Sequence, residues 1–140
     1  MPFRSRGAES GSRTGVCRWD EQGSAVVDFV LVGGLVTVFF LAIVQLTLVM
    51  HVRNTLIDAA SSGARYGTLA DRTPADARER TANLIGTALN AEFARDISTS
   101  EASVQGIRTL EVTVRAPLPV IGLIGPGPAL EVRGHAAISD

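Results

Sequence analysis

Apolar residues run from Phe29 to Met50, a stretch of 22 positions, without a single charged side chain. An α-helix rises 1.5 Å per residue, so this stretch would be about 33 Å long. That length crosses the hydrocarbon core of a bilayer, which is about 30 Å thick. An acid, Asp28, stands directly before the run, and a carboxylate at the mouth of a membrane helix is costly enough to be a functional candidate. The pattern predicts a transmembrane helix over residues 24–52.

Helical periodicity continues beyond Met50. Small and apolar residues recur at steps of three and four to about Leu69, with polar residues such as Arg53 and Arg65 between them, so the helix is expected to continue as an amphipathic one. Its stripe is unusually small: Ala60, Gly63, Ala64 and Gly67. This stripe either permits the close approach of a second helix or forms an Ala-rich core face, and the pattern leaves both interpretations open.

A second helix is predicted to begin at Pro74. Thr73 is a favourable N-cap, Pro suits the first helical position, and Asp76 completes a capping box. The helix is expected to end near Arg95. Its buried stripe is expected to comprise Ala77, Thr81, Leu84, Ile85, Ala88 and Leu89.

Two strands are predicted after the polar stretch 96–103, for which no strand is predicted. Apolar residues alternate with polar ones over 110–115 and again over 130–138, which indicates strands with one buried face. Between them, residues 116–129 contain four Pro and three Gly among apolar residues. This segment either packs on the sheet or forms a patch that faces a partner or lipid. The expected fold class is α+β, with a long N-terminal helix ahead of a small domain.

Composition narrows the function classes. The net charge of −1 gives a nucleic-acid partner no electrostatic support. The single cysteine, Cys17, allows neither an internal disulfide nor a zinc site. The apolar run is too long for a secretory signal and no small-residue cleavage site follows it, so the helix is expected to be retained. Four Arg residues precede the run and three follow it closely, a slight preference for a cytoplasmic N-terminus.

No catalytic or cofactor-binding set is recognisable. His51 and His135 are far apart, and no residues have the spacing of a nucleophilic triad or a metal cluster. The glycines of 122–127 lack the strand-to-helix context of a phosphate-binding loop. Gln45 and Thr47 stand inside the apolar run and could hydrogen-bond either to another helix or to their own backbone. We therefore expect no enzyme activity, no cofactor and no metal.

The string Gly23-Ser24-Ala25-Val26-Val27-Asp28-Phe29, followed by an apolar helix, resembles a prepilin processing motif. Together with residues 52–60 and Gly63-Ala64-Arg65-Tyr66-Gly67, it resembles the TadE-like family of minor pseudopilins from tight-adherence (Flp) pilus systems. The chain departs from that family in two ways. Asp28 replaces the usual Glu, and the leader is only mildly basic.

The resemblance implies how the chain is processed and assembled. A prepilin peptidase would cut between Gly23 and Ser24, and Asp28, beside Phe29, would pair with the terminal amine of a neighbouring subunit. The alternative for Asp28 is an interfacial acid that caps the helix. The implied domains are a leader (1–23), a transmembrane helix (24–52) and an exported part (53–140) with a pilin-like fold.

The implied location and partners follow from the same resemblance. The chain would cross the cytoplasmic membrane once, with a cytoplasmic N-terminus, and could enter a surface fibre. Its partners would be the peptidase, the major and other minor pilins, the inner-membrane assembly platform and the bilayer. The alternative function is an uncleaved, membrane-anchored extracellular binding or sensing domain.

Overall fold

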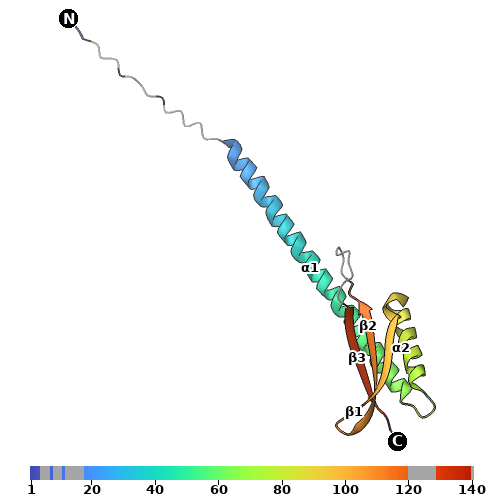
Figure 1. The fold of residues 1–140 in the computed structure, drawn as a ribbon. Helices are drawn as coiled ribbons and strands as arrows, with labels where there is room; N and C mark the ends of the chain where they lie inside the picture. Colours follow the sequence, from blue (N-terminus) through green and yellow to red (C-terminus); the bar gives the residue numbers. More distant parts are fainter. Residues whose placement is uncertain (4–6, 8–10, 12–17, 120–128, 140) are drawn as a thin grey trace. The chain divides into compact units, whose positions relative to one another are not determined.

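The computed structural model describes residues 1–3, 7, 11, 18–119 and 129–139. A long helix α1 (Arg18–Gly67) is followed by helix α2 (Pro74–Ala88) and a short 3-10 turn η1 (Ala91–Ala94). Three strands complete the fold (Figure 1): β1 (Asp96–Val104), β2 (Ile107–Pro117) and β3 (Ala129–Ala137). The predicted α+β class is confirmed. The chain divides into two compact units, Met1–Phe40 and Leu41–Asp140, which are described separately.

The first unit contains the part of α1 that lies before Leu41. Every residue from 21 to 40 is exposed, including bulky side chains such as Phe29 and Leu35, which are 80% and 71% exposed. In the part of the chain that the structure describes, α1 is the one helix long and apolar enough to cross a membrane. Because exposed side chains of this kind are unfavourable in water, this part of α1 is a membrane anchor.

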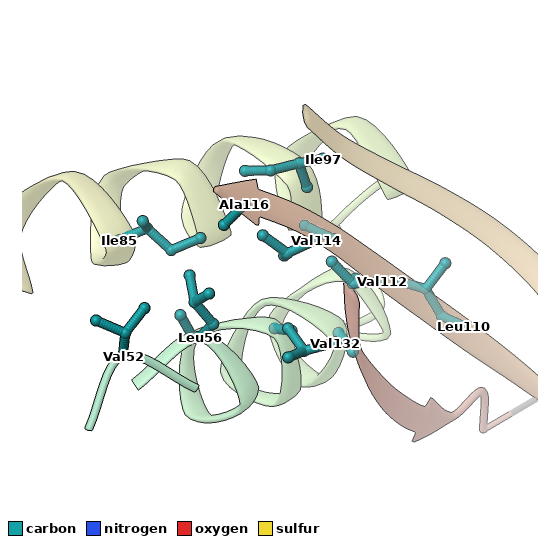
Figure 2. Packing of buried hydrophobic residues seen from close by; sticks show 13 residues of the cluster. Val52, Leu56, Ile85, Ile97, Leu110, Val112, Val114, Ala116 and Val132 are labelled. Atoms are coloured by element: carbon teal, nitrogen blue, oxygen red, sulfur yellow. The ribbon is translucent and has the colours of Figure 1, made fainter. Parts of the chain in front are cut away.

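The second unit is built on an antiparallel sheet with the strand order β1-β2-β3. The part of α1 after Leu41, together with α2, packs on one face of this sheet. Figure 2 shows the contact, with Val52 and Leu56 of α1 lying near Ile85 of α2 and Val132 of β3 close to α1. The buried apolar residues are Val52, Leu56, Ala59, Ala60, Ala64, Ala77, Ile85, Ile97, Leu110, Val112, Val114, Ala116 and Val132.

Helix α2 begins as predicted but ends early. Asp76 donates its backbone N–H to Thr73 Oγ1 at 3.3 Å, and Thr73 returns its own N–H to Asp76 Oδ2 at 2.7 Å, so the capping box is confirmed. The predicted end near Arg95 is wrong, because α2 stops at Ala88 and Asn90 is extended with φ −160°. The predicted helix was too long because the short helical turn η1 follows α2 after two intervening residues.

The predicted stripe of α2 is partly correct. Ala77, Thr81 and Ile85 are buried, while Leu84 and Leu89 are half-buried. Ala88 is exposed, contrary to the prediction, because α2 ends at this residue.

Strand β1 was not predicted. It occupies the polar stretch 96–103 and pairs with β2 through a two-residue turn, in which Gln105 and Gly106 have φ values of 53° and 83°. Two successive positive φ angles are typical of a type I′ hairpin, which matches the twist of the paired strands. Ile97 is the one buried residue of β1. An edge strand with a single buried side chain has no apolar alternation from which it could be recognised.

The two predicted strands are confirmed as β2 and β3, with slightly different bounds. β2 is central and turns Leu110, Val112, Val114 and Ala116 into the core. Residues 116–117 and 129 of the predicted loop belong to these strands, and residues 120–128 lie outside the described residues. Gly134 of β3 is buried, and a Cβ there would collide with the backbone of Ala60 and Ser61. Glycine therefore lets β3 lie directly against α1.

Candidate processing and assembly site

The four residues of the predicted processing and assembly motif all lie on the first part of α1. Gly23, Ser24, Asp28 and Phe29 are exposed, and a Cβ at Gly23 would meet no atom within 4 Å. Within the described chain, the motif is therefore presented on a bare helix surface, open to whatever enzyme, subunit or lipid surrounds it.

Helical geometry brings only some of these residues together. Ser24 and Asp28 are four positions apart on one helix, so they lie one turn apart on the same face. Gly23 and Asp28 are five positions apart and therefore face different sides. The acid consequently lies over Ser24, the residue that would carry the new amine after cleavage.

The backbone at the predicted cleavage site is helical. The sequence placed the start of the helix at residue 24, but α1 begins at Arg18, five residues before Gly23. A protease that binds extended substrate would have to unwind this first turn and a half. Glycine lowers the stability of a helix by about 1 kcal/mol relative to alanine, and helix ends fray readily, so local opening is least costly at this point of α1.

The stripe of small residues lies within the folded domain, between α1 and its neighbours in the same chain. A Cβ at Gly63 would collide with Thr81 and lie 2.8 Å from the Ala77 carbonyl oxygen, and one at Gly67 would lie 2.8 Å from Leu110 Cδ2. Ala60 and Ala64 are fully buried. The stripe thus lets the backbone of α2 approach the backbone of α1 closely.

The polar residues inside the apolar run have different partners. Thr47 donates its hydroxyl to the Ile43 carbonyl, four residues back on its own helix, at 2.8 Å. Gln45 instead donates its side-chain amide to the carbonyl of Pro119, which follows β2. The sequence alone considered another helix or the local backbone for Gln45 and missed this long-range partner. A polar residue in an apolar run was the one signal of it.

A ladder of charged side chains on the outer face of the sheet was also missed. Glu131 accepts from Arg115 at 2.9 Å and from Arg133 at 2.7 Å, while Glu111 lies 2.8 Å from His135 Nε2. These hydrogen bonds lower the pKa of Glu131, with Arg115 as the largest cause. The alternation of strand residues could have placed them on one face, but the pairing depends on the register of β2 with β3.

The described residues offer no assembled metal-binding group. Over 18–119 and 129–139, no three His, Cys, Asp or Glu side chains gather into a possible metal site. His51 is exposed on α1, and His135 is paired with Glu111. The glycines of 122–127, which the sequence analysis rejected as a phosphate-binding loop, lie outside the described residues.

Residues 23–65 match the model of the TadE-like protein family. The match begins at Gly23, covers the apolar run and ends within the small-residue stripe. The match falls on the same segment that carries the resemblance in the sequence, so this part of the chain is similar to TadE-like proteins. No curated protein and no solved structure matches the chain significantly.

Proposed function

We propose that this protein is a minor pseudopilin that contributes to the assembly of a tight-adherence pilus or a related secretion fibre after a prepilin peptidase removes residues 1–23. One observation carries the proposal: the family match starts at Gly23, the residue that precedes the proposed cut, and runs through the exposed apolar helix. The exposed motif on α1 is consistent with recognition by other membrane proteins.

The chemistry at the cut follows from the position of Gly23. Gly23 lies near the start of α1 and carries no side chain, so a peptidase in the membrane can approach the backbone closely once the helix end opens. The cut would free an amine on Ser24. The polar leader, which contains the one cysteine of the chain, would be lost with it.

Asp28 is the proposed assembly residue. Its carboxylate keeps its charge in an apolar environment at a tolerable free-energy cost only if a cation lies within about 4–6 Å. The Ser24 amine of the same chain is one helical turn away, so pairing within the chain competes with pairing to a neighbouring subunit. The new helix N-terminus itself also favours the acid. Two subunits would be joined when the Asp28 carboxylate exchanges the Ser24 amine of its own chain for that of a neighbouring subunit.

The proposed location is the cytoplasmic membrane, with the N-terminus in the cytoplasm and residues 53–140 exported. The proposed partners are the prepilin peptidase, the major and other minor pilins, and the inner-membrane assembly platform. A reporter that is active only outside the membrane, fused after Asp140, should be active. Activity of a cytoplasm-only reporter at the same position would reverse the orientation and exclude fibre assembly.

Cleavage is the decisive test. Mass spectrometry of the membrane-extracted wild-type protein should find Ser24 at the N-terminus, and Gly23→Leu should leave the full-length chain. Gly33→Leu is the matched control, because Gly33 lies on the same bare helix with no neighbour within 4 Å of a Cβ; it should be cut normally. A full-length wild-type chain in cells that contain the peptidase would favour the uncleaved, membrane-anchored binding domain instead.

Asp28 is tested by association. Asp28→Ala should insert into the membrane and be cleaved, but it should lose association with the major pilin in detergent extracts. Asp28→Glu keeps the charge and should associate normally. Equal recovery of the major pilin with wild type and Asp28→Ala would assign Asp28 to helix capping alone.

A further inference from the structure

Helix α1 has two different flanks where it enters the folded domain, over residues 43–50. On one flank, Gln45, Leu48 and Val49 are half-buried. On the other flank, large apolar side chains are exposed: Ile43, Val44, Leu46 and Met50. Water is an unfavourable neighbour for that many apolar side chains, so something apolar covers the second flank.

On the half-buried flank, the polar side chain of Gln45 has a distant backbone partner. Gln45 donates its side-chain amide to the backbone carbonyl of Pro119. Leu118 and Pro119 are half-buried and come directly after β2. In lipid, an unsatisfied backbone carbonyl costs several kcal/mol, so backbone groups there must find partners inside the protein. The pair satisfies one amide and one carbonyl at the same point.

The hydrogen bond between Gln45 and Pro119 lies at a level of α1 that is still inside the apolar run. Polar and charged residues resume at His51 and Arg53, and Gln45 lies six residues earlier, about 9 Å along a helix. A bilayer that covers Ile43, Leu46 and Met50 therefore also reaches the level of Gln45. Because Pro119 is hydrogen-bonded to Gln45, it lies at that level too.

We propose that the start of the β2–β3 connection, Leu118–Pro119, is inserted into the membrane leaflet on the side of the folded domain, and that Gln45 holds it there by capping the Pro119 carbonyl. The occupant of the exposed flank of α1 is then lipid, which also surrounds Leu118. The folded domain is seated in the membrane surface and not held clear of it. This inference rests on the anchoring of α1 in a bilayer and not on a role in a pilus.

A different arrangement makes a different prediction. If the helix of a neighbouring subunit covered Ile43 and Met50 outside the bilayer, Leu118 and Pro119 would lie in water or against protein. The two cases are separated by the depth of Leu118 in a membrane that contains this chain alone.

The experiment uses the full chain with Cys17→Ser, reconstituted into phosphatidylcholine–phosphatidylglycerol vesicles, with one nitroxide attached at a chosen cysteine. Leu118→Cys is the test position, Leu35→Cys on the bare helix is the lipid reference, and Val104→Cys at the hairpin, 49% exposed, is the water reference. Collision with oxygen reports lipid, and collision with a water-soluble nickel chelate reports water.

We expect the nitroxide at Leu118 to behave like that at Leu35, with collisions dominated by oxygen. A Leu118 nitroxide that collides with the nickel chelate as freely as that at Val104 overturns the proposal, and so does one shielded from both reagents. If the nitroxide at Leu35 also collides with the chelate, the anchoring itself fails, and the proposal fails with it. The reference position therefore distinguishes the two failures.

The role of Gln45 is tested with a matched pair of variants. Gln45→Leu removes the capping amide, whereas Thr47→Val removes a polar group that bonds only its own helix in the described contacts. Gln45→Leu should shift Leu118 from lipid toward water, because the Pro119 carbonyl loses its hydrogen-bond donor and is more stable when hydrated. Thr47→Val should leave Leu118 in lipid. The same accessibility of Leu118 in both variants would overturn the capping role of Gln45.

Discussion

The first part of helix α1 leaves its apolar surface exposed in the structure, whereas the second part buries its apolar surface against the folded domain. Residues 21–40 are all exposed and mostly bulky, and a Cβ at Gly33 or Gly34 would meet no atom within 4 Å. Five of residues 52–67 belong to the buried core, and three of these five are alanines. Gly63 and Gly67 on this second part contact α2 so closely that no Cβ would fit without a shift.

The comparison shows that small residues at the closest contacts distinguish the part of α1 that packs on protein from the bare part. Lipid chains adapt to bulky side chains, so an anchor needs only length and apolarity. A neighbouring helix or strand in a folded domain is rigid, so close packing requires small residues at the contact. Each prediction below changes α1 or an element that packs on its second part, and the first three use a matched site elsewhere as control.

The largest effect is expected at Leu56, which is fully buried. Leu56→Ala should lower the free energy of unfolding of the domain by about 2–5 kcal/mol, because it removes buried methyl groups and leaves a cavity. Leu35→Ala makes the same chemical change on the bare part of α1 and should leave that free energy unchanged. Urea unfolding in detergent micelles, followed by proteolysis of the unfolded fraction, measures both. Equal losses would mean that the two parts of α1 do not differ as described.

A close backbone contact should give the next effect. Gly134→Ala places a Cβ against the backbone of Ala60 and Ser61, and such overpacking typically costs about 1–3 kcal/mol. Gly86→Ala is the control, since Gly86 is exposed on α2 with no neighbour within 4 Å of a Cβ. It should stabilise the domain by roughly 0.5–1 kcal/mol through helix propensity. Thermal unfolding by circular dichroism should show shifts of opposite sign, and a shared sign would contradict the packing of β3 on α1.

The helix that covers the small stripe is itself held by its cap. Thr73→Ala removes the hydroxyl that accepts from Asp76 N and should cost about 1 kcal/mol. Thr87→Ala removes a hydroxyl that bonds only the Asn83 carbonyl within α2 among the described contacts, so it should have little effect. Hydrogen exchange of α2 amides should rise near Pro74 in the first variant only.

The smallest expected effect is a dependence of the domain's stability on pH below about 4, caused by Asp76. Hydrogen bonds from the Thr73 backbone, and then from its side chain, hold the pKa of Asp76 below its ordinary value of 3.8. A pKa that is lower in the folded state contributes stability above the ordinary value, and this contribution is lost as the pH falls through the folded-state pKa. Asp76→Asn should therefore flatten the pH profile of stability below about pH 4. An unchanged slope would show that the cap is not ionised when folded.

The elements with strong periodic signals could be predicted from the sequence, and those fixed by pairing could not. The continuation of α1 beyond Met50, the cap at Thr73 and the alternation around Val112 all rest on local rules, and the structure confirms them. β1 was missed because an edge strand with one buried residue, Ile97, depends on β2 for its backbone hydrogen bonds. The end of α2 was misplaced because η1 continues a helical pattern over residues 91–94.

The candidate site divides in the same way. Gly23, Ser24, Asp28 and Phe29 could be picked out because their motif is local, and the structure shows where they lie without testing what they do. The partner of Gln45 could not be found, since residues 45 and 119 meet only after the sheet has formed. The neighbours of Gly63 and Gly67 likewise became known only from the fold, although small size had already marked these residues as contacts.

The packing of Gly134 against Ala60 also constrains how the domain is made. β3 follows α1, α2, β1 and β2 in the chain, so Ala60 has no β3 partner until the residues around Gly134 have been made. Until Val132 and Gly134 have emerged and docked, the core remains open on one side, and its apolar residues are available to chaperones, proteases and other unfinished chains. The core is therefore closed by a contact between residues far apart in the sequence, and it is complete only when the last strand has docked.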